Sequence, residues 1–106
     1  MTIIAEQTLD LSFTSDKLAA RLFAPEQKDE ETWVCRFEIG APINESLDAQ
    51  GVSSLQALAL ALKSLSAALY SSELYRNGQL GAFGEFNGYL GIPAPGIFKD
   101  IAPFTF

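Results

Sequence analysis

The chain has 106 residues, of which 48% are hydrophobic and 19% charged, and its thirteen acidic and seven basic side chains give a net charge of −6. This balance argues against nucleic acid and anionic membranes as partners, because phosphate recognition needs clustered lysine and arginine. The longest apolar run, residues 57–62, is too short to span a bilayer, and residues 1–10 lack the pattern of a signal peptide, so we expect a cytoplasmic protein.

Three segments near the N-terminus are predicted to be strands, because their apolar residues alternate with polar ones as in half-buried strands. They lie within residues 3–13, 18–24 and 32–39. The connection at residues 25–31 is rich in charged and turn-forming residues, which indicates an exposed hairpin loop. Residues 43–50 fit either a short edge strand or a loop, and the sequence does not decide between them.

The strongest signal predicts a helix over about residues 54–71. Ser53 and Gln56 match a capping box at its start. A stripe of leucines at helical spacing is expected to face the sheet, with Leu60 standing apart on the polar side. The leucines of the stripe are Leu55, Leu58, Leu62, Leu65 and Leu69. A second short helical turn is predicted to reach Asn77 and to end at Gly78.

These elements predict an α+β fold in a single domain over residues 1–106. We expect a small antiparallel sheet of three to four strands, with one long amphipathic helix packed across one face. The C-terminal segment, residues 78–106, is expected to be irregular and rich in glycine and aromatic residues.

Residues 80–96 contain five of the eight glycines, interspersed with Phe83, Phe86 and Tyr89. The segment has neither the phosphate-binding loop pattern nor the dinucleotide-binding pattern. We interpret it as backbone lying closely over the core, with the aromatic side chains filling the space between. The alternative is that these aromatic residues dock on another subunit, and for residues 93–106 the choice stays open.

The sequence predicts no catalytic residue, no cofactor site and no metal site. Histidine is absent, which removes the commonest general base and metal ligand. Cys35 is expected to be buried and inert, and a single cysteine suits a reducing compartment. An acidic cluster before Trp33 is interpreted as exposed turn charge rather than a cation site; it comprises Glu26, Asp29, Glu30 and Glu31. An acid/base pair of Glu38 and Glu85 is an alternative that nothing in the sequence places together.

The candidate interaction surface consists of five large apolar side chains: Leu60, Trp33, Phe83, Phe86 and Tyr89. Trp33 is the only tryptophan, and we favour a core anchor over a binding hot spot for it.

The chain resembles an uncharacterised bacterial family of small α+β proteins, a domain of unknown function. The resemblance rests on "TIIAEQTLDL" at the start, on "WVC" and the following "EI" in residues 33–39, and on "GVSSLQALALAL" at residues 51–62. It covers about the first 70 residues. It implies this fold and a bacterial cytoplasm, and it brings no catalytic residue.

Our first hypothesis for the function is a non-enzymatic protein-interaction module. It binds another protein or its own copy, through Leu60 or the aromatic C-terminal segment, and an immunity- or antitoxin-like role belongs to this class. The alternative hypothesis is a small-molecule binder or carboxylate-dependent enzyme, with a pocket between the sheet and residues 80–96.

Overall fold

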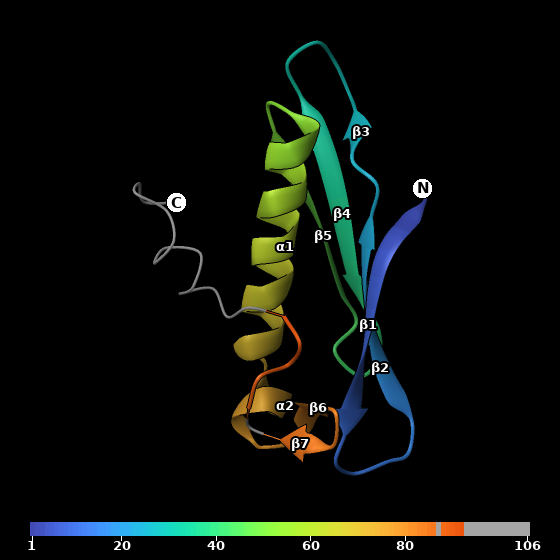
Figure 1. Ribbon diagram of the computed structural model, residues 1–106, viewed down its shortest axis with the longest axis vertical. Coiled ribbons are helices and arrows are strands. Elements are labelled where there is room, and N and C mark those ends of the chain that lie inside the picture. Colours follow the sequence, from blue (N-terminus) through green and yellow to red (C-terminus); the bar gives the residue numbers. More distant parts are fainter. Residues whose placement is uncertain (87, 93–106) are drawn as a thin grey trace.

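The computed structural model describes residues 1–86 and 88–92, which form one layer of strands and one main helix (Figure 1). In chain order the elements are β1 (Ile3–Leu11), β2 (Lys17–Phe23), β3 (Glu26–Gln27), β4 (Trp33–Ile39), β5 (Glu45–Gly51), α1 (Ser54–Tyr70), α2 (Glu73–Arg76), β6 (Leu80–Ala82) and β7 (Glu85–Phe86).

All seven strands belong to one antiparallel sheet. β4 pairs with β5 along one edge, and with β2 and β3 along the other. Within the sheet, β1 pairs with the other side of β2, β6 pairs with β1, and β7 pairs with β6. The expected sheet of three to four strands, and with it the predicted fold class, is therefore wrong. The protein is a mostly-sheet fold of seven strands with one helix of 17 residues.

The strands that the sequence did not predict are polar or very short. β5 reads "ESLDAQG" and forms seven consecutive pairs with β4, so the segment left open between edge strand and loop is a strand. An edge strand buries fewer of its side chains than a central strand does, so apolar and polar residues need not alternate clearly along it. β3, β6 and β7 have two or three residues each, too few to show a period.

The predicted helix ends are confirmed. Ser53 caps α1 by accepting a hydrogen bond from the Gln56 backbone N–H at 3.0 Å, and the Gln56 side chain accepts one from the Val52 N–H at 2.7 Å. α1 ends at Tyr70, and the short α2 follows as expected. Gly78, with φ +71°, then lets the chain turn away in the left-handed region.

The predicted burial of the leucine stripe is only partly right. Leu65 and Leu69 are buried, Leu58 and Leu62 are half-buried, and Leu55 is 73% exposed. The face of α1 against the sheet is shifted toward the small residues Ala57 and Ala61, which are fully buried. Small side chains let the helix approach closely, and the leucines are displaced to its flank. The approach is so close that a Cβ at Gly51 would lie 2.6 Å from the Ala57 nitrogen.

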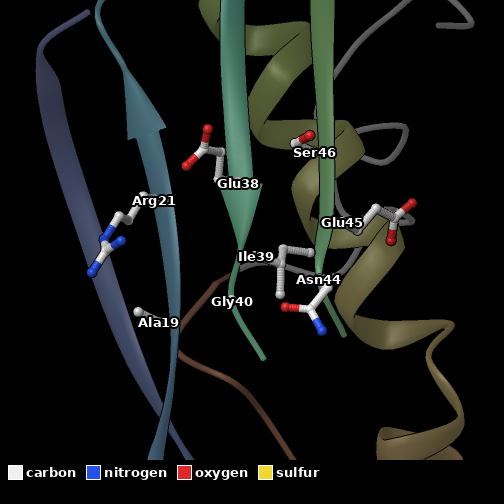
Figure 2. Close-up of a pocket in the computed structure, with 8 residues that line it drawn as sticks. All are labelled: Ala19, Arg21, Glu38, Ile39, Gly40, Asn44, Glu45 and Ser46. Carbon is white, nitrogen blue, oxygen red and sulfur yellow. The ribbon is translucent and has the colours of Figure 1, made fainter. Parts of the chain in front are cut away.

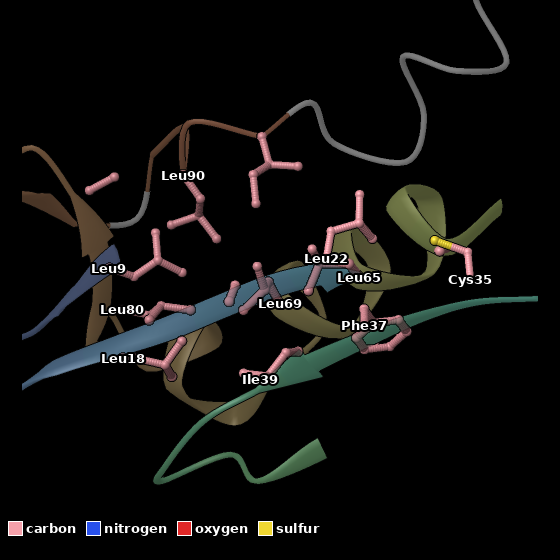
Figure 3. Close-up of a cluster of buried hydrophobic side chains, with 14 of the residues drawn as sticks. Leu9, Leu18, Leu22, Cys35, Phe37, Ile39, Leu65, Leu69, Leu80 and Leu90 are labelled. Carbon is pink, nitrogen blue, oxygen red and sulfur yellow. The ribbon is translucent and has the colours of Figure 1, made fainter. Parts of the chain in front are cut away.

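The core lies between the sheet and α1, with residues 88–92 closing one end (Figure 3). It receives alternate residues from the three predicted strands, as their periodicity required. Its largest fully buried side chains are Phe37, Leu9, Leu18, Leu69, Leu80 and Leu90. Phe13 is an exception to the predicted pattern, because β1 ends at Leu11 and Phe13 is exposed in the turn that follows.

The sheet face away from α1 carries a row of ion pairs. Arg21 contacts Glu6 at 2.6 Å, and Arg36 contacts both Glu38 and Asp48, at 2.9 and 3.2 Å. These side chains come from β1, β2, β4 and β5, so the row crosses the sheet. That one domain spans residues 1–106 stays a prediction, since residues 93–106 lie outside the described residues.

Candidate functional site

The end of the sheet opposite the start of α1 is formed by the β6–β7 hairpin (Figure 1). The two residues that join its strands, Phe83 and Gly84, both have positive φ, +55° and +80°. Two positive φ angles are typical of the type I′ turn, whose twist matches that of antiparallel strands. Glycine adopts this conformation freely, whereas phenylalanine does so at a cost in backbone energy.

Phe83 therefore combines backbone strain with exposure, because its side chain is 82% exposed at the tip of the turn. A bulky residue in the left-handed region costs of the order of 1 kcal/mol or more, and buried apolar contact does not compensate for it here. Strained residues persist when the surrounding structure holds them, and they gather at functional sites. This residue marks the hairpin as the strongest site candidate.

Asp10 in β1 holds the turn in place. Its Oδ2 accepts a hydrogen bond from the Gly84 N–H at 2.9 Å, and its Oδ1 pairs with the Lys17 ammonium. These contacts, Lys17 first and the Gly84 N–H second, hold the pKa of Asp10 below its usual value near 3.8. In addition to the pairing of β6 with β1, one ionised carboxylate thus connects the turn to β1 and β2.

The segment after the hairpin is fixed by two tyrosines. The Tyr70 hydroxyl donates to the Ile92 carbonyl at 2.6 Å and accepts from the Leu90 N–H at 3.0 Å. The Tyr75 hydroxyl donates to the Gly88 carbonyl at 3.1 Å. The two rings meet edge to face at 5.1 Å, and burial raises the pKa of the Tyr70 phenol.

Close packing on β1 fixes the same segment. The Gln7 side chain donates to the Leu90 carbonyl at 3.4 Å, and Gly91 has φ +84°. A Cβ at Gly91 would lie 2.6 Å from Gln7 Nε2. Leu90 and Ile92 are buried, as we expected for a segment that lies over the core.

The aromatic residues of this region are exposed, and the expectation that they fill space in the core is wrong. Phe83, Phe86 and Tyr89 are 82%, 37% and 60% exposed. Because Leu90 and Ile92 already occupy the core at this end, the aromatic rings remain on the outside. We call Phe83, Phe86 and Tyr89 the aromatic tip. Three of the five predicted surface residues therefore lie within seven positions of one another.

The structure does not bring the other two predicted residues to the aromatic tip. Trp33 begins β4, is half-buried and packs against the core beside Gly51, which agrees with a core anchor. The start of β4 lies near the start of α1, at the end of the sheet away from the hairpin (Figure 1). Leu60 is half-buried in the middle of α1. Their roles, like those of the aromatic tip, stay predictions.

The two glutamates of the alternative hypothesis lie on different elements. Glu38 lines an open hollow of about 280 Å³ on the sheet face away from α1, together with Arg21 and Ser46 (Figure 2). Its carboxylate pairs with Arg36, and Arg21 pairs with Glu6. Glu85 is exposed in β7. The hollow lined by Glu38 does not include Glu85 and has no aromatic wall.

Cys35 is fully buried in β4, as predicted, and its thiol donates to the Phe23 carbonyl at 3.1 Å. Burial raises the pKa of this thiol and so disfavours the reactive thiolate. Within residues 1–86 and 88–92, no three acidic, cysteine or histidine side chains gather where they could hold a metal ion. The Asp29 carboxylate instead accepts a hydrogen bond from the Glu31 N–H in its own turn.

The helices of the described chain are all too short or too polar to cross a bilayer. A family model described as a domain of unknown function (DUF6968) matches residues 5–94. The chain belongs to this family. The DUF6968 match extends past the first 70 residues, where the resemblance was seen, and it includes the hairpin and residues 88–92. Neither the curated proteins nor the solved structures contain a match to the chain.

Proposed function

We propose that this DUF6968 protein is a non-enzymatic protein-interaction module whose aromatic tip binds a partner protein. The observation that carries the proposal is Phe83, a large side chain that is almost fully exposed on a strained but firmly held turn. Aromatic residues dominate the binding energy of many protein interfaces, and they do so best when they are held rigidly. Strain at a site with no role in the core is explained if the site has a role in binding.

The surroundings of the aromatic tip indicate what kind of partner it fits. Glu85 flanks the turn, Asp10 there is paired with Lys17, and the whole chain carries a net charge of −6. A partner with an apolar socket and a basic rim complements this surface, since opposite charges steer association and set orientation. The absence of histidine and the burial of the single cysteine support a role without covalent chemistry.

The test compares alanine substitutions of two large apolar residues, Phe83 and Leu55, which are similarly exposed but lie at opposite ends of the molecule. Phe83→Ala is expected to lower partner affinity at least about tenfold, as for a hot-spot residue. Leu55→Ala, in the first turn of α1, is expected to leave affinity unchanged, because Leu55 is exposed but lies far from the hairpin. Immobilised wild type and both variants are exposed to lysate of the source cells, and the retained proteins are quantified by mass spectrometry.

The expected result is a protein retained by wild type and by Leu55→Ala, and released or lost with Phe83→Ala. Its direct affinity for the purified chain is then measured by calorimetry at low and high salt, where a basic rim predicts weaker binding at high salt. Equal retention by Phe83→Ala and wild type would show that the aromatic tip is not the binding surface.

A further inference from the structure

We propose that the protein forms a two-fold dimer in which the β5 edges of two copies pair antiparallel and their α1 helices pack side by side. The proposal concerns a different surface from the aromatic tip and goes beyond the proposed function. It rests on the β5 edge, on one face of α1 and on a cleft beside them.

β5 is a long edge strand that has only one of the features that normally prevent edge pairing, charged side chains. Among the described residues it pairs only with β4, over seven positions and without a register shift. It contains no proline, no lysine and no bulge, which are three of the usual devices that protect an edge, and its two charged residues, Glu45 and Asp48, are both acidic. The strands at the other end of the sheet order, β6 and β7, have only three and two residues. Figure 2 shows β5 as the outermost strand, with α1 behind the sheet.

The charges of β5 exclude some registers for a second copy, and the exposure of Leu47 favours one of those that remain. If the two-fold axis passes through Leu47, then Leu47 lies opposite itself, Ser46 opposite Asp48, and Glu45 opposite Ala49. No like charges then lie directly opposite each other. A shift to an axis through Asp48 would place two carboxylates opposite each other, which destabilises a strand pair. Leu47 is 50% exposed in the single chain and would be covered in this register.

The position of α1 fits a second helix beside it. α1 packs against β4 and β5 alike, so its axis lies between these two strands. With strands about 4.8 Å apart, the helices of two copies joined at β5 would lie about 10 Å apart. Helices in direct contact are ~8–10 Å apart. Pairing of the strands therefore brings the two helices into contact without a change in either copy.

The helix face that would meet its copy consists of small residues and one leucine. Leu60, Ser64, Ala67 and Ser71 follow one another at spacings of four, three and four, so they share a side of α1. Ala68, next to this row, lines a cleft together with Glu45 of β5, which shows that the row is on the β5 side. Small residues permit close approach, and Leu60 is the large side chain that remains to be buried.

The cleft supplies a place for Leu60 of the second copy. It has a volume of about 480 Å³, and it is lined by the apolar residues Pro42, Ile43, Ala68 and Leu74 together with the charged Glu45, Glu73 and Arg76. α1 starts beside Gly51 and runs antiparallel to β5, so Leu60 is displaced along the strand by about 8 Å from the axis at Leu47, toward Gly51. The two-fold operation displaces Leu60 of the second copy by the same distance in the opposite direction. It is then level with the C-terminal end of α1, where the cleft opens.

The solution mass is the first measurement. Light scattering across micromolar to submillimolar concentrations is expected to give twice the mass of the chain. Leu60→Asp is expected to weaken the dimer at least about tenfold, because it places a carboxylate in the cleft. The matched control is Leu55→Asp, which introduces the same charge on the opposite flank of α1 and should leave the mass unchanged. Phe83→Ala should also remain dimeric, which separates this proposal from the proposed function.

Cross-linking tests the register and does not depend on Leu60. A cysteine in place of Leu47 would face its copy, and directly opposed positions are about 4.5–5.5 Å apart at Cβ. The native Cys35 is buried, so the wild type gives the background. Under mild oxidation or with a short bis-maleimide, Leu47→Cys should cross-link into dimers, and Leu55→Cys should not. Circular dichroism establishes that each variant is folded.

Two results would overturn the proposal. One is a monomeric mass at all concentrations. The other is a dimer that Leu60→Asp does not weaken and in which Leu47→Cys cross-links no faster than Leu55→Cys. If Leu60→Asp fails to fold, the cross-linking comparison alone decides.

Discussion

Phe83 shows how a single residue can keep an unfavourable conformation. Its positive φ is imposed by the two-residue connection between β6 and β7, which is too short for other turn geometries that suit antiparallel strands. Gly84 fills the second position without strain, and its N–H is held by Asp10. The neighbours thus determine the conformation, while Phe83 bears the energetic cost.

Replacing Phe83 by asparagine should stabilise the protein. Asn-Gly is the preferred sequence for this turn, because asparagine enters the left-handed region more readily than phenylalanine. We expect Phe83→Asn to raise the free energy of unfolding by about 1 kcal/mol, the lower end of the range for such strain. Urea denaturation measures it as a higher midpoint at unchanged slope.

The control for this prediction is Phe86→Asn, since Phe86 is also a tip residue but its φ is not in the left-handed region. It should bring no gain in stability. A less stable Phe83→Asn variant would mean that the ring, and not the backbone, is what the fold requires at this position. A variant that is more stable but no longer binds its partner would match the general conflict between stability and function.

At the scale of elements, residues 88–92 depend on hydrogen bonds to side chains more than on regular structure. The hydroxyls of Tyr70 and Tyr75 form hydrogen bonds with three backbone groups of this segment, and the Gln7 side chain forms one with a fourth. Leu90 and Ile92 can reach the core only if the backbone between them approaches β1 closely. Gly91 provides that approach, with a positive φ and no side chain.

The two glycines of this segment give a matched comparison. Gly91→Ala should lower the free energy of unfolding by about 1–3 kcal/mol, because its Cβ meets Gln7 and its φ is unfavourable for alanine. Gly88→Ala should change it by less than about 0.5 kcal/mol, since a Cβ there meets nothing within 4 Å. Thermal and denaturant unfolding of both variants measure the difference. Equal effects would contradict the close approach at Gly91.

The elements also show which parts of the fold the sequence could predict. α1, α2 and the strands β1, β2 and β4 were predictable, because their periodicity reports burial on one side. β5 was not decided, since an edge strand needs no alternation. The leucine stripe predicted the wrong face for Leu55, because periodicity finds an apolar stripe but cannot tell that alanines allow a closer approach than leucines.

The candidate site was predictable only as a set of residues. Phe83, Phe86 and Tyr89 could be selected because three aromatic residues lie in one short glycine-rich segment, but their exposure depends on Leu90 and Ile92 occupying the core instead. The turn that strains Phe83 is held by the hydrogen bond from Gly84 to Asp10, and these two residues are 74 positions apart, so no local pattern contains their pairing. An aromatic residue followed by glycine between two short apolar runs was the one signal available for the turn.

At the scale of the whole molecule, Asp10 links three parts of the sheet: β1, β2 through Lys17, and the β6–β7 turn through Gly84. Its pKa is lowered in the folded state, so its ionised form contributes stability at pH values above about 3.8. That contribution is lost as the pH falls below 3.8 and through the folded pKa. The unfolded chain then binds the proton more readily than the folded one.

The comparison of wild type with Asp10→Asn isolates this contribution from that of the other carboxylates. The wild type should be the more stable of the two near neutral pH, and the difference in free energy of unfolding should shrink as the pH falls below 3.8. Chemical denaturation at a series of pH values measures both curves. A difference that stays constant with pH would show that Asp10 is not held as an ion.

The row of ion pairs on the sheet face away from α1 has a consequence for how the chain finds its pairing. Side chains alternate between the two faces of a sheet, so a slip of one residue between neighbouring strands would turn Glu6, Arg21 or Arg36 inward. A charge buried under the helix costs far more than any misaligned hydrogen bonds return. The charged side chains on this face therefore favour the native register over one shifted by a single residue, which would place them under α1.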